Sequence, residues 1–183
     1  MYYCMYPYPY FVNIPTFHYG IQPVQETFSP ERGYRPQPIQ DTKEWKDYGS
    51  NPYVVNINEA SKQNETFRTA IWTGNHLQVT VMSIPPGKDI GLEIHPDVDQ
   101  FLRIEDGHGH VQMGDTEDHL YFQRNVFGDD AIMVPAGKWH NLINAGYKPL
   151  KLYTIYAPPE HPFGTIHNTK ADAMAAEHNQ YRY

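Results

Sequence analysis

The stretch GLEIHPDVDQFLRIEDG, residues 91–107, places polar side chains where a β-strand would bring them together. Glu93 and His95 are two residues apart, so on a strand both side chains point to the same face of the sheet. The loop PDVD, residues 96–99, then allows the next strand to present Gln100 beside them. The pattern predicts a cluster of ligand atoms inside a β-structure.

A second segment, residues 135–144, reads Pro-x-Gly-x-x-His-x-x-x-Asn. Together the two segments resemble the motifs of the cupin superfamily, whose first motif is His-x-His, three or four residues, Glu, six residues, Gly. The second motif matches at every fixed position. The first matches in spacing, up to Gly107, but has Glu93 in place of the first His and Gln100 in place of the Glu.

The resemblance covers roughly residues 66 to 158 and implies an all-β fold, a double-stranded β-helix or jelly-roll barrel. It also implies a single metal site with the ligands Glu93, His95, Gln100 and His140. His140 would arrive from a later strand than the other three residues.

The altered ligand set keeps the charge of the usual one. Three His and one Glu carry one negative charge, and so do two His, one Glu and one Gln. We therefore expect one divalent ion, and the added oxygen ligand favours Fe(II) or Mn(II), with Zn(II) or Ni(II) as alternatives. The sequence leaves open whether Gln100 contacts the ion or holds a water bound to it.

Two alternatives stand beside this metal site. In one, the same residues form an ion-free polar cluster, although burial of Glu93 without a cation would cost several kcal/mol. In the other, His95 and Asp97 are the ligand pair, but that register breaks the spacing to Gly107.

Four further histidines are weaker candidates. His108 and His110 share the strand face opposite to the core, so we expect them to be exposed. His161 and His167 lie in a segment with Pro and Gly that could cover the barrel mouth, but we expect ordinary surface histidines there.

The chain divides into three parts by composition. Residues 1–52 form an arm, because eight of the 16 prolines and nine of the 15 tyrosines fall in residues 1–53 and dense proline disfavours regular structure. This arm is either a tail without fixed structure or a segment that packs on a second subunit. Residues 53–168 form the barrel, and residues 169–183 form a helix and tail.

Short alternating or apolar runs with turn residues between them predict the strands of the barrel. The expected strand segments are YVVNI (53–57), FRTAIWTG (67–74), LQVTVMSI (77–84), GLEIH (91–95), QFLRIE (100–105), HVQM (110–113), AIMVPAG (131–137), HNLIN (140–144) and LKLYTIYA (150–157). Two helices are expected, a short one through residues 58–63 and a second that begins at Thr169, where Thr169 and Asp172 form an N-terminal cap.

The charge and the cysteine content limit the partners. The net charge of −7 argues against nucleic acid or an anionic membrane as a partner, since both attract clustered Lys and Arg. A small-molecule ligand fits better, and edge strands favour a homodimer. With Cys4 as the only cysteine and no signal peptide pattern, we expect a cytoplasmic protein.

Cupins host many activities, so fold alone does not decide function. We expect a metal-dependent enzyme that acts on a small polar molecule by dioxygenase-like or isomerase- and epimerase-like chemistry, with Trp139 or Tyr156 at the rim in contact with substrate. No general base is identified. The alternative is a non-catalytic metal- or ligand-binding protein of an assembly such as a spore coat, with the arm as its adhesive part.

Overall fold

The structure, a computed structural model, describes residues 45–180. Most of the predicted arm therefore lies outside the described residues. The helices and strands are α1 (Ile57–Gln63), β1 (Arg68–Thr73), β2 (Gln78–Ile84), β3 (Asp99–Asp106), β4 (His108–Gly114), β5 (Phe122–Phe127), β6 (Ala131–Val134), β7 (Trp139–Asn144), β8 (Leu150–Ala157), β9 (Ile166–His167) and α2 (Lys170–Gln180).

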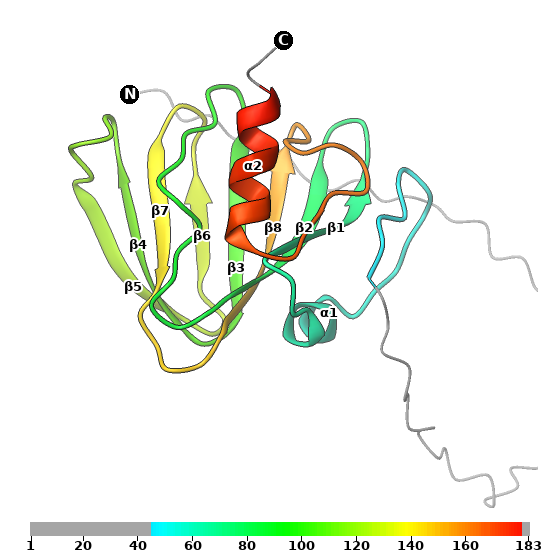
Figure 1. Cartoon of the computed structure of the whole chain (residues 1–183), viewed down its shortest axis with the longest axis horizontal. Helices are drawn as coiled ribbons and strands as arrows, with labels where there is room; N and C mark the ends of the chain where they lie inside the picture. Colours follow the sequence, from blue (N-terminus) through cyan, green and yellow to red (C-terminus); the bar gives the residue numbers. More distant parts are fainter. Residues whose placement is uncertain (1–44, 181–183) are drawn as a thin grey trace, which may run out of the picture. The chain divides into compact units, whose positions relative to one another are not determined.

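The strands form two antiparallel sheets. The larger sheet has the order β6-β3-β8-β2-β1-β9 and the smaller one the order β5-β4-β7. Figure 1 shows β4, β5 and β7 on one side of the barrel and β1, β2, β3 and β8 on the other. This arrangement confirms the expected all-β double-stranded β-helix.

The interior of this barrel is apolar at one end and polar at the other. Along β8, alternation directs Leu150, Leu152, Thr154 and Tyr156 inward, in that order, because successive side chains of a strand point to opposite faces. The neighbouring strands follow the same gradient, since Met82 on β2 pairs with Leu152 whereas Gln100 on β3 pairs with Tyr156.

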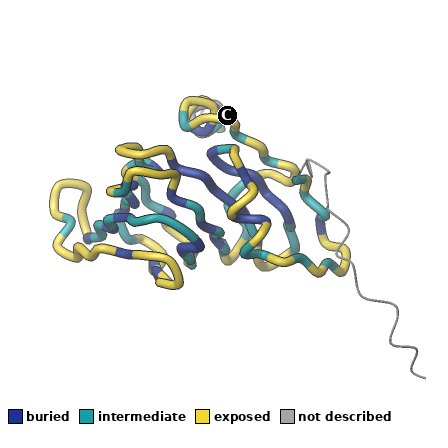
Figure 2. The backbone as a smooth tube through the Cα atoms, turned by 90° about the horizontal axis from the view of Figure 1, so that it is seen from below, coloured by how far each residue is buried: buried dark blue, intermediate teal, exposed yellow. Residues whose placement is uncertain are grey.

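The apolar end is the main core. Its members come from both sheets and are fully or almost fully buried: Met82, Ile84, Leu102, Ile104, Val111, Val126, Ile132, Val134, Leu142, Leu150 and Leu152. Figure 2 shows this burial as dark blue stretches along the strands, with exposed yellow segments in the connecting loops. The core thus holds the two sheets together and leaves the other end of the barrel for polar side chains.

Helix α1 covers the outer face of the larger sheet. Ala60 packs there with Ile71 of β1 and Val81 of β2, and Trp45 and Val55 pack against this second cluster. The expected strand at residues 53–57 is wrong, because the side chain of Asn56 accepts a hydrogen bond from the Glu59 N–H and starts the helix instead.

Three other strand predictions differ from the structure, one of them because the two-residue strand β9 was not expected. Residues 91–95 form no regular strand and pair only through an isolated bridge between Glu93 and His140. Strand β5 was missed because it is an edge strand in which only Val126 is buried, so its sequence lacks the alternation of a half-buried strand.

The predicted second helix is confirmed as α2, with the expected cap. The Thr169 N–H donates to Asp172 Oδ2 at 2.9 Å, and the Asp172 N–H donates to Thr169 Oγ1 at 3.2 Å. Ala173 then anchors the helix to the main core. Neither α1 nor α2 is long and apolar enough to cross a membrane.

Candidate metal site

The two sequence motifs meet at the polar end of the barrel. Glu93 and His140 exchange two backbone hydrogen bonds, of 3.0 and 2.9 Å, and the Gly137 N–H donates to the His95 carbonyl at 2.8 Å. The hydrogen bond from Gly137 to His95 needs a tight turn at residue 137. There φ is +76°, a conformation that glycine adopts without strain. Backbone pairing therefore brings three potential ligands together.

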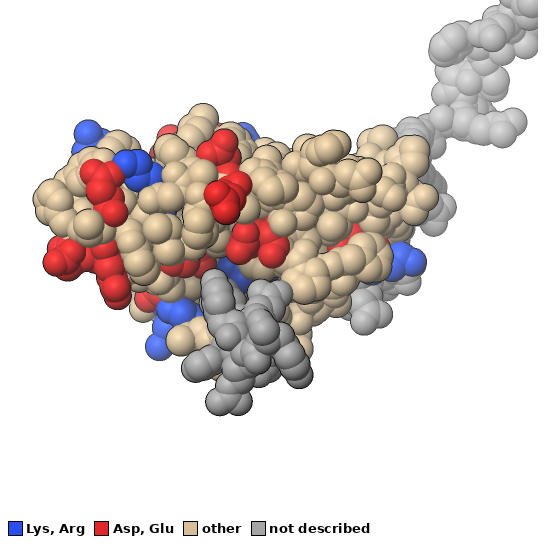
Figure 3. Space-filling view, turned by 90° about the horizontal axis from the view of Figure 1, so that it is seen from above, with Lys and Arg blue, Asp and Glu red and all other residues tan. Residues whose placement is uncertain are grey.

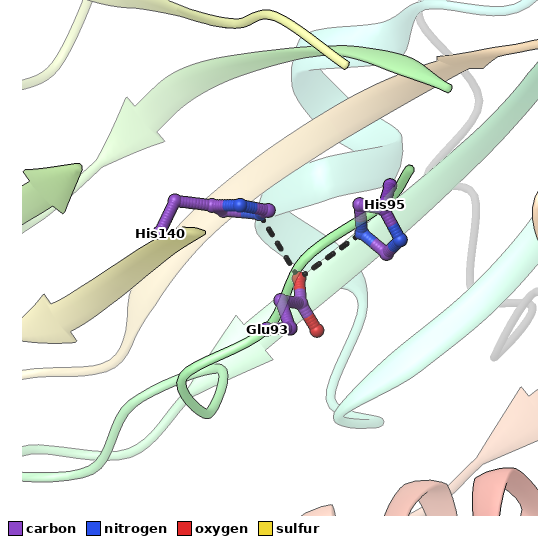
Figure 4. A group of neighbouring side chains, drawn as sticks. All are labelled: Glu93, His95 and His140. Atoms are coloured by element: carbon purple, nitrogen blue, oxygen red, sulfur yellow. Dashed lines mark ion pairs between the residues drawn. The ribbon is translucent and has the colours of Figure 1, made fainter. Parts of the chain in front are cut away.

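The side chains of Glu93, His95 and His140 converge on one point, as Figure 4 shows. Glu93 Oε1 lies 3.3 Å from His140 Nε2 and 3.5 Å from His95 Nε2. One ligand atom from each residue lies within 4.8 Å of the others. Such a group of one carboxylate and two imidazoles could hold a metal ion.

Each imidazole has a partner on its far side that directs Nε2 toward Glu93. His95 Nδ1 lies 3.2 Å from Glu160 Oε1, and His140 Nδ1 lies 3.0 Å from the Lys138 carbonyl oxygen. Both oxygens are acceptors, so they hold a proton on Nδ1 and leave Nε2 as the atom through which each ring could bind a metal. This is the arrangement commonly found around histidine ligands of metals.

The local charges favour a cation at this point. Burial opposes ionisation of Glu93, but contacts with His140 and His95 and the charge of Arg68 outweigh it and hold the pKa of Glu93 well below its usual range. Burial would likewise lower the pKa of His95, yet the carboxylates of Glu160 and Glu93 raise it to about 9. The two carboxylates therefore create a negative potential that stabilises positive charge between the rings.

Gln100 lies on the same inward-facing side, though it is not one of the three converging residues. Its side chain is 3% exposed, and its Nε2 donates to Thr154 Oγ1 at 3.3 Å. Gln100 pairs across the sheet with Tyr156, whose ring lies 5.7 Å from that of His95. The bond to Thr154 leaves the amide oxygen of Gln100 without a protein partner among the described residues.

The three converging atoms, like the amide oxygen of Gln100, have no hydrogen-bond partner among the described residues. Within residues 45–180, Glu93 Oε1, His95 Nε2 and His140 Nε2 are buried and make no hydrogen bond of acceptable geometry, although they lie at ion-pair distance. Buried polar atoms without partners are uncommon in folded proteins. A cation that accepts these lone pairs would satisfy all three atoms, so the ligand set fits a divalent metal.

The alternative ligand pair and two of the weaker histidines lie elsewhere. Asp97 is exposed and takes no part in the cluster. His108 stacks on Phe127 with ring centroids 4.5 Å apart, and His110 contacts Asn125. Both histidines face away from the core, as predicted, but they are half-buried rather than fully exposed.

His161 and Tyr156 differ from expectation. His161 is half-buried against Tyr156, with ring centroids 5.0 Å apart, and its backbone N–H donates to Gln78 Oε1 at 3.0 Å. The segment after β8 therefore folds over the polar end. Tyr156 is fully buried, so it lies inside the barrel and not at its rim.

Sequence reasoning missed Glu160 and Arg68. Glu160 lies outside both motifs, and its only signal in the sequence is a carboxylate in the segment PPEHP, which could cover the barrel mouth. Arg68 is 1% exposed at the start of β1, and the sequence of that strand does not distinguish it from a surface arginine.

An open depression of about 630 Å³ lies apart from these residues. Residues 46–51, residues 73–75 and Phe163 line it. None of its lining residues belongs to the converging group, so it does not bear on the metal site.

The fold and the site together define a double-stranded β-helix protein with one carboxylate and two imidazoles at the end of its barrel. The sequence pattern of the family described as "Cupin domain" matches residues 80–156. The chain belongs to the cupin family.

Three proteins are similar to this chain at 43% identity or more. The uncharacterized protein YrkC of Bacillus subtilis is 72% identical over 132 residues, which are 72% of this chain and 71% of YrkC. The uncharacterized protein L612 of Acanthamoeba polyphaga mimivirus is 43% identical over 115 residues, 62% of this chain and 70% of L612. The crystal structure of BH2720 from Bacillus halodurans is 63% identical with a TM-score of 0.70 and covers 71% of this chain and 98% of its own.

Proposed function

We propose that the protein is a metal-dependent enzyme that acts on a small polar molecule at a single metal centre held by Glu93, His95, Gln100 and His140. The observation that carries the proposal is the convergence of Glu93 Oε1, His95 Nε2 and His140 Nε2 in the barrel without hydrogen-bond partners among the described residues. The oxygen atom of Gln100 would supply the fourth ligand, since its amide nitrogen is engaged by Thr154.

The ligand set suggests the metal and the chemistry. Two imidazoles, one carboxylate and an amide oxygen favour Fe(II) or Mn(II), with Zn(II) or Ni(II) as alternatives. Such an ion, when bound, supplies Lewis-acid polarisation or O₂ activation, which corresponds to isomerase- or dioxygenase-like reactions. The protein residues hold the ion and orient its ligands, with Glu160 and the Lys138 carbonyl fixing the two rings.

Metal content tests the proposal directly. We expect about one divalent ion per chain by elemental analysis after purification without chelator. Metal-free protein should gain thermal stability on addition of Fe(II), Mn(II), Ni(II) or Zn(II), because an ion that binds only the folded state stabilises it. Protein that contains no metal and shows no thermal shift with any of the four would contradict the proposed site.

Two further predictions accompany this function. The homodimer is proposed because β6 and β9 end the larger sheet and β5 and β7 end the smaller one, and edge strands offer backbone groups for pairing. The cytoplasmic location rests on the single cysteine, Cys4. Figure 3 shows acidic side chains over the left and centre of the visible face with some basic ones among them. Together with the net charge of −7, this supports a small-molecule ligand in preference to a polyanionic partner.

A further inference from the structure

The outer face of the smaller sheet carries no Asp, Glu, Lys or Arg among the described residues. Strands β4, β5 and β7 alternate between inward residues such as Val111, Val126 and Leu142 and outward ones, because successive side chains of a strand point to opposite faces. All the outward residues are half-buried or exposed. They are His108, His110, Gln112, Gln123, Asn125, Phe127, Trp139, Asn141 and Ile143.

Neither helix of the described chain covers this face. Helix α1 packs on the outer face of the larger sheet, and Figure 1 shows both α1 and α2 away from β4 and β5. Along the edge strand β5, Gln123 and Asn125 are exposed, and the large ring of Phe127 is 51% exposed. The outer face of the smaller sheet is therefore available for contact with another molecule.

The polar groups of this face are ordered and complementary to themselves. One ring nitrogen of His110 lies 3.0 Å from Asn125 Oδ1 and the other 3.3 Å from Gln123 Oε1, and His108 stacks on Phe127. Amides and neutral imidazoles each both donate and accept hydrogen bonds. Two copies of such a face can therefore satisfy each other, whereas two copies of a face with one sign of charge repel.

Charge favours this face for contact between copies of the chain. The net charge of −7 makes two copies repel each other as they approach. The outer face of the larger sheet includes Asp99, Arg103 and Lys151, whereas the smaller sheet offers only neutral outward side chains. The cores of protein interfaces are depleted in charged residues and enriched in aromatic ones such as Phe127 and Trp139. Two copies can thus meet here without burying an acidic side chain.

We infer that two copies of this chain pack against each other through the outer faces of their smaller sheets, related by a two-fold axis. The two sheets would lie about 10 Å apart, the usual spacing of stacked sheets. Gln112 would lie near the axis, because Gln123 and Asn141 flank it on the neighbouring strands. The inference goes beyond the proposed function, since it does not depend on the metal, and it names a surface for the homodimer that requires no pairing of edge strands.

Sedimentation equilibrium of the full chain measures the dissociation constant of the dimer. Gln112→Glu replaces an amide by a carboxylate of nearly the same size, so two negative charges would face each other near the axis. We expect the dissociation constant to rise at least about tenfold, because like charges opposed across an interface are strongly unfavourable. Gln63→Glu is the matched control, since Gln63 is exposed at the end of α1. It adds the same charge and should leave the dissociation constant unchanged.

A mixture of two variants tests whether the face meets its own copy. Gln112→Lys alone should also weaken the dimer, whereas an equimolar mixture of Gln112→Glu and Gln112→Lys should restore it, because opposite charges then face each other. The inference would be overturned by an unmodified chain that is monomeric at every concentration, by Gln112→Glu that dimerises as tightly as the unmodified chain, or by a mixture that stays monomeric. Elemental analysis of the same samples tests the metal site separately, so failure of the proposed function and failure of this interface are distinguishable.

Discussion

Glu160 lies outside both motifs but contacts one of the candidate metal ligands. Its carboxylate lies 3.2 Å from His95 Nδ1 and comes from the segment that folds over the polar end of the barrel. A carboxylate in this position fixes the ring orientation and makes the other nitrogen a better ligand. The site thus depends on a chain segment that neither motif contains.

Replacement of Glu160 tests this dependence. Glu160→Gln should weaken metal affinity by about 10- to 100-fold, because a neutral amide stabilises the ligand tautomer less than a carboxylate does. Glu117→Gln, in an exposed loop, is the matched control and should leave the affinity unchanged. Competition with a chelating dye measures the metal affinity of both variants. If Glu160→Gln binds metal as tightly as Glu117→Gln, Glu160 does not contribute to metal binding.

Gln100 provides a second test at the level of single residues. Gln100→Leu should weaken metal binding less than His140→Ala, because an amide oxygen is a weaker ligand than imidazole. Gln100→Glu adds a second carboxylate and should tighten binding through the extra negative charge. Elemental analysis and dye competition measure the three variants, and complete metal loss in both Gln100→Leu and His140→Ala would show that Gln100 is as essential as the histidine.

Among the larger elements, the turn that leads from β3 of the larger sheet to β4 of the smaller one depends on Gly107. Its φ is +107°, and an added Cβ would lie 3.1 Å from the Leu150 Cα and 3.2 Å from the Pro149 carbonyl oxygen. Both the backbone conformation and the contact with β8 therefore exclude a side chain. The glycine that ends the first motif thus lies against the start of β8, where the chain leaves the larger sheet.

Gly107→Ala should lower the free energy of unfolding by about 2–4 kcal/mol, from backbone strain and overpacking together. Gly87→Ala is the control, because φ there is +69° but no atom lies within 4 Å of the added Cβ. That variant should lose only about 1–2 kcal/mol, the cost of the left-handed conformation. Urea denaturation gives both values, and equal losses would mean that the contact with residues 149–150 is unimportant.

At the scale of the whole molecule, the Tyr- and Pro-rich residues before Trp45 raise the question of assembly. Apolar area left in water is unfavourable by roughly 25 cal/mol per Å², and a segment this rich in tyrosine has large apolar area to bury. We propose that it packs on the barrel of a second subunit in a homodimer.

Deletion of residues 2–40 should therefore lower the molar mass by light scattering from that of a dimer to that of a monomer, or lower the melting temperature. The full-length chain at the same concentration is the control. A truncated protein that remains dimeric with an unchanged melting temperature would contradict the proposed role of the arm in assembly.

Much of the fold could be predicted from local patterns. The alternation in LKLYTIYA predicted β8 because a strand buried on one face repeats every two residues. Phe122–Phe127 lacked that signal because an edge strand buries little, and residues 53–57 were wrongly assigned because their apolar side chains pack beside a helix start. Local patterns therefore gave wrong strand predictions where a segment is buried by a distant element or is hardly buried at all.

From the sequence by itself came the candidate ligands Glu93, His95, Gln100 and His140 and the charge they bring. The structure brings Glu93, His95 and His140 together. Only the tertiary structure brought Glu160 to His95 and Arg68 toward Tyr156. The Glu160–His95 contact and the effect of the Arg68 charge on Tyr156 each join segments more than sixty residues apart. They depend on the strand register and on the path of the segment after β8. Neither of these can be predicted from the local alternation of apolar and polar residues.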